Sequence, residues 1–273
     1  MKNLISALVA VALILTGCSK IQNNNSPGKL IVKVTDDQFR IDYVTSATVK
    51  ITKIEIRKAG VQTENPFIVL STDTLSFDLI NLRNGITSEL LNLDIPQGNY
   101  NLIRLYVEEA GLKIKDQTTE YKVKVPSGQQ TGIKVFINPP LVVDGGLTSE
   151  LLLDIDLSKS FVLRGDLNHS AGINGFIFKP VIRAVNNTTA GRLEGMVTDT
   201  AKVKIKEASV WVKQDTIVAN TIADTLGHYA IIGIPAGTYS VFAAKDNYDT
   251  VKVDGVKIIE GNRTILNFVL PKK

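Results

Sequence analysis

The stretch Ile234-Pro235-Ala236-Gly237-Thr238-Tyr239 leads directly into the apolar run Ser240–Ala244, and it decides the fold class. Proline fixes φ ahead of a turn, and glycine supplies a corner with positive φ. The tyrosine then opens a strand, where its ring packs and its hydroxyl can bond to nearby backbone. The same device stands earlier, as Ile95-Pro96-Gln97-Gly98-Asn99-Tyr100. Two such units predict β-structure in both halves of the chain.

Period-two alternation of apolar and polar residues extends outward from this device. Val49–Arg57 is the clearest case, with one irregularity near Lys53. Alternation rich in β-branched residues and bounded by Gly, Pro and Asn is typical of antiparallel strands. It predicts strands at 30–35, 49–57, 101–108, 112–115, 121–125, 133–137, 150–157 and 176–185, and leaves room for one short helix within 79–91.

A second block follows the polar stretch Asn186–Ala190. Its predicted strands are 193–198, 208–213, 217–221, 228–232, 238–244, 248–253 and 262–270. Short strands separated by turn signals every eight to twelve residues or so are typical of a small β-sandwich. The sequence therefore predicts an all-β protein with two β-sandwich domains, residues 29–186 and 191–273.

Composition excludes several classes of protein. The 273 residues carry 31 Lys and Arg against 27 Asp and Glu, so the net charge of +4 is too small to indicate a nucleic-acid binder. With 1 Cys and 2 His, the chain lacks the residues for an internal disulfide or a Cys/His zinc site. No cofactor is expected.

The single cysteine follows an apolar N-terminal run. Residues 4–15 are too short to span a bilayer, which takes about 20 residues, and they fit the core of a secretory signal peptide. Leu15-Thr16-Gly17-Cys18 resembles the lipobox of bacterial lipoproteins. The resemblance implies cleavage after residue 17, acylation of Cys18 and a polar tether over 18–28. It places the protein outside the cytoplasm, anchored to the outer membrane with its face undetermined; the alternative is a cleaved signal followed by an incidental cysteine.

The second block resembles the carboxypeptidase regulatory-like domain, a prealbumin- or transthyretin-like sandwich. The matching segments are Gly195–Asp199, Ala208–Val212, Thr221–Tyr229, Gly233–Tyr239 and Asn247-Tyr248. The resemblance covers nearly all of residues 191–273 and implies a fold without a catalytic residue. Whether the first block uses a related sandwich stays open, because the shared Pro-x-Gly-x-Tyr turn also suits any tight hairpin.

The first block resembles a bacterial lipoprotein family known as domain of unknown function 4382, over about residues 28–186. The segments that carry the likeness are Gly28–Asp36, Val49–Ile54, Val125–Lys134, Leu152–Ser160 and Phe178–Arg183. Asp37-Gln38 departs from the pattern, which often has a small residue and Pro there. The resemblance implies an extracytoplasmic location and no particular reaction.

Candidate chemistry is sparse. Only His169 and His228 offer a neutral-pH base, and neither has the sequence context of a Ser-His-Asp or zinc hydrolase. Asp36-Asp37 and the pair Asp154 and Asp156 offer hard oxygens for Ca²⁺, although solvated strand ends have the same composition. We therefore expect no catalytic residue and no metal, with Asp154 and Asp156 as the weak metal candidates.

Two further patterns are candidates for binding and modification. The polar residues Ser127, Gln129, Gln130 and Thr131 lie in a Gly-containing loop between strands, which is either a binding loop or a long hairpin turn. Asp-Thr-aliphatic tripeptides resemble an O-glycosylation sequon of bacterial secreted proteins, although Asp-Thr is also common turn chemistry. The threonines concerned are Thr74, Thr200, Thr216, Thr225 and Thr250.

These observations predict a non-catalytic cell-envelope lipoprotein that acts as a binding or display module. Its expected partners are the membrane, through the acyl chains, and a glycan or an envelope protein. One alternative is an accessory or regulatory subunit of a glycan- or peptide-processing enzyme, which requires Asp154, Asp156 and His169 to converge in one concave site. Another is a fimbrial-type structural subunit, which requires a missing or donated strand.

Overall fold

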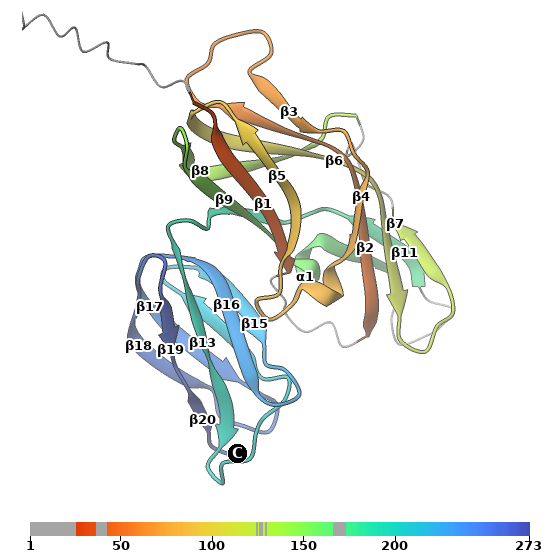
Figure 1. Ribbon diagram of the computed structural model, residues 1–273. Coiled ribbons are helices and arrows are strands. Elements are labelled where there is room, and N and C mark those ends of the chain that lie inside the picture. The colour runs from red at the N-terminus through yellow and green to blue at the C-terminus, as the bar shows by residue number, and fades with distance from the viewer. Residues whose placement is uncertain (1–25, 37–42, 124, 126–127, 129, 166–172) are drawn as a thin grey trace, which may run out of the picture.

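The computed structural model describes residues 26–36, 43–123, 125, 128, 130–165 and 173–273. The predicted all-β fold is confirmed, because strands form nearly all of the regular structure (Figure 1). The buried apolar residues divide into two clusters, one within residues 30–184 and one within residues 193–270. We call the corresponding parts of the chain the N-terminal domain and the C-terminal domain.

The N-terminal domain is built on one ten-stranded sheet, which we describe as two smaller sheets that share a single connection. The first has the strand order β12(Ile182–Asn186), β9(Thr148–Ile155), β1(Gly28–Asp36) and β5(Ser88–Ile95). The second contains β8(Ile133–Val143), β6(Gly98–Ile114), β2(Val44–Lys58) and β3(Phe67–Ser71), with β4(Leu75–Asp78) on β2 and β7(Glu120–Val123) on β6. A single bridge between Ala184 and Ile137 joins the sheets along one side, and the apolar core lies between them.

Parallel pairing departs from the antiparallel arrangement that the alternation predicts. β1 pairs in parallel with β9, and Leu151, Leu152 and Leu153 of β9 are all buried. A strand covered on both faces reads as a continuous apolar run and does not alternate. The irregularity predicted near Lys53 is confirmed as register shifts between β2 and β6 on either side of Ile51.

Short elements complete the N-terminal domain. Within 79–91 only the 3₁₀ turn η1(Leu79–Leu82) is helical; a loop follows it, and β5 begins at Ser88. The strand predicted over 176–185 is two strands, β11(Ile173–Phe178) and β12, since Pro180 has no N–H to donate to a ladder. One turn of helix, α1(Leu157–Ser160), precedes β10(Phe161–Gly165), which pairs with β11. The Asp156 carboxylate caps α1 by accepting the Lys159 N–H at 3.0 Å.

The C-terminal domain is a sandwich of two four-stranded sheets. One contains β16(His228–Pro235), β13(Ala190–Asp199), β19(Arg263–Ile265) and β20(Phe268–Leu270). The other has the order β15(Ile217–Ile222), β14(Ser209–Lys213), β17(Gly237–Ala244) and β18(Val251–Ile258). No helix among the described residues is long and apolar enough to cross a membrane.

The turn that opened the sequence analysis works alike in both domains. The hydroxyl of Tyr100 donates to the carbonyl oxygen of Pro96 at 2.5 Å, and that of Tyr239 donates to Pro235 at 2.8 Å. Gly98 has the expected positive φ, 147°. At Gly237 the reason for glycine differs, because a Cβ there would lie 3.3 Å from the Tyr239 ring. The tyrosine therefore fixes the start of β6 and of β17.

Candidate binding site between the two domains

The C-terminal domain docks on the outer face of β9 and β12. Leu152 and Val185 face each other across these strands, and both are buried although neither belongs to the apolar cores. Gly233 of β16 approaches them closely, since a Cβ there would lie 2.6 Å from Leu152 Cδ2. Its φ of +66° also favours glycine. This contact explains why Leu152 is buried on the face turned away from the N-terminal core.

Polar contacts fasten the same junction. Arg183 on β12 donates to the Gly233 carbonyl oxygen at 2.6 Å and to Asp154 Oδ2 at 2.5 Å. Asn84, in the loop before β5, accepts from the Ala230 N–H at 2.6 Å and donates to the His228 carbonyl oxygen at 3.3 Å. The amide of Asn84 thus pairs with backbone groups of β16, an edge strand of its sheet.

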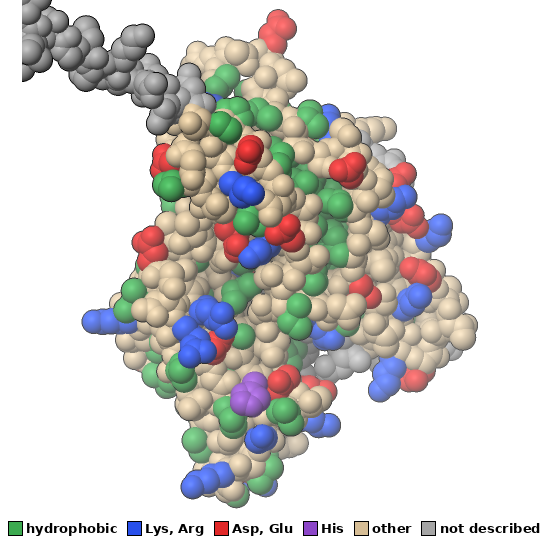
Figure 2. Space-filling model, viewed as in Figure 1, with side chains coloured by type: hydrophobic (Ala, Val, Ile, Leu, Met, Phe, Trp, Pro, Cys, Tyr) green, Lys and Arg blue, Asp and Glu red, His purple; other side chains and the backbone are tan. Residues whose placement is uncertain are grey.

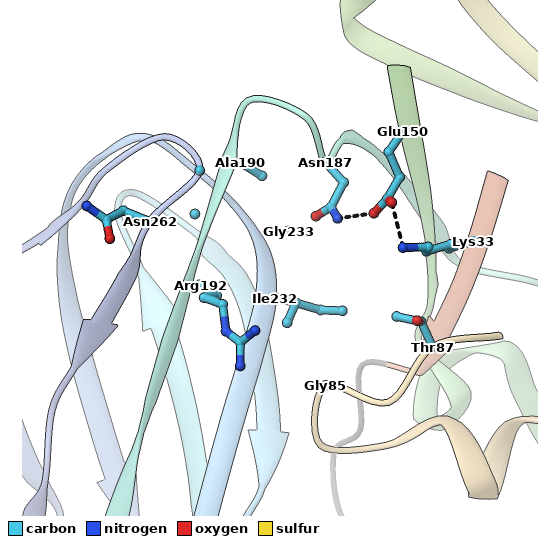
Figure 3. Close-up of a pocket in the computed structure, with 12 residues that line it drawn as sticks. Lys33, Gly85, Thr87, Glu150, Asn187, Ala190, Arg192, Ile232, Gly233 and Asn262 are labelled. Atoms are coloured by element: carbon cyan, nitrogen blue, oxygen red, sulfur yellow. Dashed lines mark hydrogen bonds and ion pairs between the residues drawn. The ribbon is translucent and has the colours of Figure 1, made fainter. Parts of the chain in front are cut away.

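A polar cleft of about 290 Å³ opens beside this junction (Figure 3). Lys33, Thr87, Glu150 and Asn187 line it from the N-terminal side, and Arg192 and Asn262 line it from the C-terminal domain. Glu150 is the centre of a small network, because Lys33 Nζ lies 2.5 Å from its Oε2 and the Asn187 amide donates to its Oε1. Figure 3 shows both links converging on Glu150.

The cleft offers hydrogen bonds without a reactive group. Its side chains supply ammonium, guanidinium, amide, hydroxyl and carboxylate functions. Among the described residues that line it there is no cysteine or histidine, and Thr87 is the only hydroxyl residue. General base catalysis needs a basic side chain within hydrogen-bond reach of the proton it removes, and Glu150 is held by Lys33 and Asn187 instead. The arrangement suits reversible binding of a polar ligand.

The predicted acidic candidates have different partners. Asp154 is buried and paired with Arg183, whereas Asp156 caps α1 and pairs with Lys159 Nζ at 2.5 Å. Of the two histidines, His228 is exposed at the start of β16, and His169 lies outside the described residues. No group of three or more His, Cys, Asp or Glu side chains in the described part of the chain could hold a metal ion.

Asp154 has an acidic neighbour that its sequence spacing does not reveal. Asp36 ends β1, next to β9, and both carboxylates are 4% exposed. Burial raises the pKa of Asp36 well above its usual range, and the hydrogen bond from the Leu157 N–H opposes this only in part. Burial also raises the pKa of Asp154, against the attraction of Arg183. The parallel pairing of β1 with β9 brings these acids together.

Part of the predicted binding loop lies beside a second charged cluster. Ser127 and Gln129 are outside the described residues, while Gln130 and Thr131 lie in a turn before β8. At Gly132 a Cβ would lie 2.6 Å from Arg104 Cγ, so the end of this loop rests on the Arg104 side chain.

Glu55 is the centre of that cluster. It is buried, accepts from Tyr106 Oη at 3.0 Å, and lies 2.5 Å from Lys53 Nζ and 3.2 Å from Arg104 Nη1. Although burial acts in the opposite direction, the hydrogen bonds from Lys53 and Tyr106 hold the pKa of Glu55 below its usual value. Lys53 and Glu55 on β2 and Arg104 and Tyr106 on β6 form this cluster. The sequence prediction did not include it, because the two strands are about fifty residues apart in the chain.

All five threonines of the Asp-Thr tripeptides are exposed in turns or loops. Their aspartates have structural partners in several cases: Asp224 Oδ1 accepts the N–H groups of Leu226 and His228, at 2.8 and 2.9 Å. The turn chemistry and an accessible hydroxyl therefore coexist at these sites. Elsewhere on the surface, acidic and basic side chains are interspersed on the face drawn in Figure 2.

Solved structures with related strand arrangements resemble this chain weakly. A cohesin-X-dockerin complex from Acetivibrio cellulolyticus matches at 18% identity and a TM-score of 0.24, covering 29% of this chain and 56% of that chain. The Bacillus anthracis TIE protein matches at 14% identity and 0.27, covering 89% and 41%. BcpA, the major pilin subunit of Bacillus cereus, matches at 13% and 0.27, covering 90% and 100%. This chain thus spans less than two thirds of the first two, and such low scores assign no function.

Family comparisons are more specific. No curated protein matches the chain. The carboxypeptidase regulatory-like domain matches residues 192–271, which are the C-terminal sandwich. The family described as "Domain of unknown function (DUF4382)" matches residues 27–180, which is more than half of the sequence. Both resemblances noted in the sequence are thereby confirmed, in the same order along the chain. The chain belongs to the DUF4382 family and carries a carboxypeptidase regulatory-like domain after it.

Proposed function

We propose that this chain is a non-catalytic, lipid-anchored protein of the cell envelope that binds a sugar residue of a glycan in the cleft between its domains. The observation that carries the proposal is the polar lining of that cleft, contributed by both domains and without an available general base. Its volume, about 290 Å³, suits a ligand of the size of one sugar unit better than a long peptide.

The Lys33–Glu150–Asn187 network supports a hydroxyl-rich ligand. Its three side chains hold one another in place, so their remaining donors and acceptors are oriented before the ligand arrives. Preorganisation of this kind reduces the entropy lost on binding. Opposite them, the Arg192 side chain lines the cleft, is 52% exposed and pairs with Glu194.

Acylation of Cys18 is the second part of the proposal. It rests on the lipobox-like sequence, and Cys18 lies outside the described residues. Two or more acyl chains give stable membrane anchoring, whereas one chain binds only marginally. Mass spectrometry of the N-terminal peptide from the native protein should show acylated Cys18. The Cys18→Ser variant should leave the membrane fraction, and a Cys18 that carries no lipid would contradict the anchor.

A glycan array probed with the full chain tests the binding function. We expect Arg192→Ala and Thr87→Ala to weaken binding of the captured glycan about tenfold or more. Each change removes a polar side chain that lines the cleft and is not part of an apolar core. Lys213→Ala is the matched control, since Lys213 is exposed on β14, outside the cleft. Binding that all three variants retain equally, or capture of an envelope protein with no glycan bound, would refute the cleft as a sugar site.

A further inference from the structure

A second, small cavity lies between the domains. Its volume is about 10 Å³, and Thr35, Asp36 and Asp154 form its wall on the N-terminal side. Asn220 and Thr221 of β15, with residues 230–232 of β16, close it from the C-terminal domain. It is distinct from the sugar cleft, with which it shares only Gly85 and Ile232.

Two carboxylate oxygens in this wall have no hydrogen-bond partner. Asp36 Oδ1 accepts from the Leu157 N–H at 3.1 Å, which leaves Oδ2 unpartnered. Asp154 Oδ2 is held by Arg183 at 2.5 Å, which leaves Oδ1 unpartnered. Both side chains are 96% buried, being 4% exposed. The second oxygen of each acid is therefore the one available to the cavity.

Buried carboxylate oxygens without partners are costly, and native proteins satisfy nearly all of them. The Thr35 hydroxyl in the wall donates elsewhere, to the Ile86 carbonyl oxygen at 2.8 Å. The guanidinium of Arg183 pairs directly with only one of the two carboxylates, that of Asp154. Two acceptor oxygens around an ion-sized space call for a positive charge between them.

We propose that this cavity binds one hard cation through the carboxylates of Asp36 and Asp154, and that Ca²⁺ fits it. Ca²⁺ takes carboxylate, amide and backbone carbonyl oxygens in flexible geometry, and Asn220 places an amide side chain in the same wall. Mg²⁺ keeps several of its water molecules in protein sites, for which a space of about 10 Å³ has no room. The bound ion links the two domains, since residues of both domains line the cavity.

Calorimetric titration of the chelator-treated full chain, purified in detergent, tests this site with CaCl₂ and, separately, MgCl₂. The variants are Asp36→Asn and Asp154→Asn. The matched control is Asp156→Asn, which removes a neighbouring buried acid that does not line the cavity, and Asn also caps helices.

The wild-type chain and Asp156→Asn should bind one Ca²⁺ and gain thermal stability, with little response to Mg²⁺. Asp36→Asn and Asp154→Asn should lose at least tenfold in Ca²⁺ affinity. The proposal is overturned if the wild-type chain binds no Ca²⁺ at millimolar concentration, or if the two cavity variants bind it as well as the control. Should either variant fail to fold, the wild-type titration still decides. None of these outcomes depends on glycan binding.

Discussion

The contact between Leu152 and Gly233 determines how tightly the two domains are coupled, and a double-mutant cycle measures it. Leu152 lies on β9 of the N-terminal domain and Gly233 on β16 of the C-terminal domain. The variants are Leu152→Ala, Gly233→Ala and the pair together. Both residues are fully or almost fully buried, so each change acts on packing and leaves the surface charge as it is.

The magnitudes follow from the geometry. Leu152 is 0% exposed, and truncating a buried leucine to alanine costs about 2–5 kcal/mol of unfolding free energy. At Gly233 a Cβ meets Leu152 Cδ2 at 2.6 Å, an overpacked contact that costs about 1–3 kcal/mol. The φ of +66° adds roughly 1 kcal/mol for any residue with a Cβ. In the Leu152→Ala background the clash disappears and only the backbone cost remains.

Chemical denaturation of all four proteins supplies the four free energies. We expect the double variant to be about 1–3 kcal/mol more stable than the sum of the single effects, because the alanine methyl occupies space that Leu152 has vacated. Unfolding of each domain is followed separately, with the single tryptophan, Trp211, reporting on the C-terminal sandwich. Additivity to within about 0.5 kcal/mol would refute the contact and, with it, the docking of the two domains described above.

Three other outcomes follow from the junction and the surface. Asn84→Gly removes both side-chain hydrogen bonds to β16, and glycine tolerates the left-handed backbone at this position, where φ is 57°. Amide hydrogen exchange at Ala230, measured by NMR, should therefore accelerate by about 5–30-fold. Unchanged exchange would count against the docking. In metal-free buffer Asp36→Asn should raise the free energy of unfolding at neutral pH. The folded-state pKa of Asp36 is raised, so the wild-type chain loses stability as the pH rises through that pKa, and the advantage of the variant should disappear as the pH falls toward the unfolded-state pKa of aspartate. A stabilisation that does not depend on pH would contradict this prediction. If the Asp-Thr threonines carry glycans, the intact mass of the native protein should exceed that of the lipidated polypeptide, and equality would exclude the modification.

Much of the C-terminal domain could be predicted from local sequence features. The turn at Pro235 to Tyr239, the alternation around it and the polar stretch at 186–190 all act over a few residues, and each has a direct counterpart in the structure. The break at Pro180 and the capping of α1 by Asp156 obey the same local rules, but the sequence prediction ran one strand through Pro180 and treated Asp156 as a metal candidate.

The junction could not be read in this way, because its residues meet only after the chain has folded. Asp36 and Asp154 are 118 positions apart and become neighbours through parallel pairing of β1 with β9, which alternation does not specify. Leu152 looks like any core leucine of a buried strand. Its partner Gly233 belongs to the other domain, so only the docked pair shows that its side chain faces outward.

A direct titration shows whether a glycan binds in the interdomain cleft. Whole-chain protein is titrated with the glycan that the array selects, and the affinities of wild type, Arg192→Ala and Lys213→Ala are compared. We expect saturable binding by the wild-type chain and by Lys213→Ala, and an affinity about tenfold or more lower for Arg192→Ala. Equal affinity in all three proteins would place the glycan elsewhere on the molecule and contradict the claim.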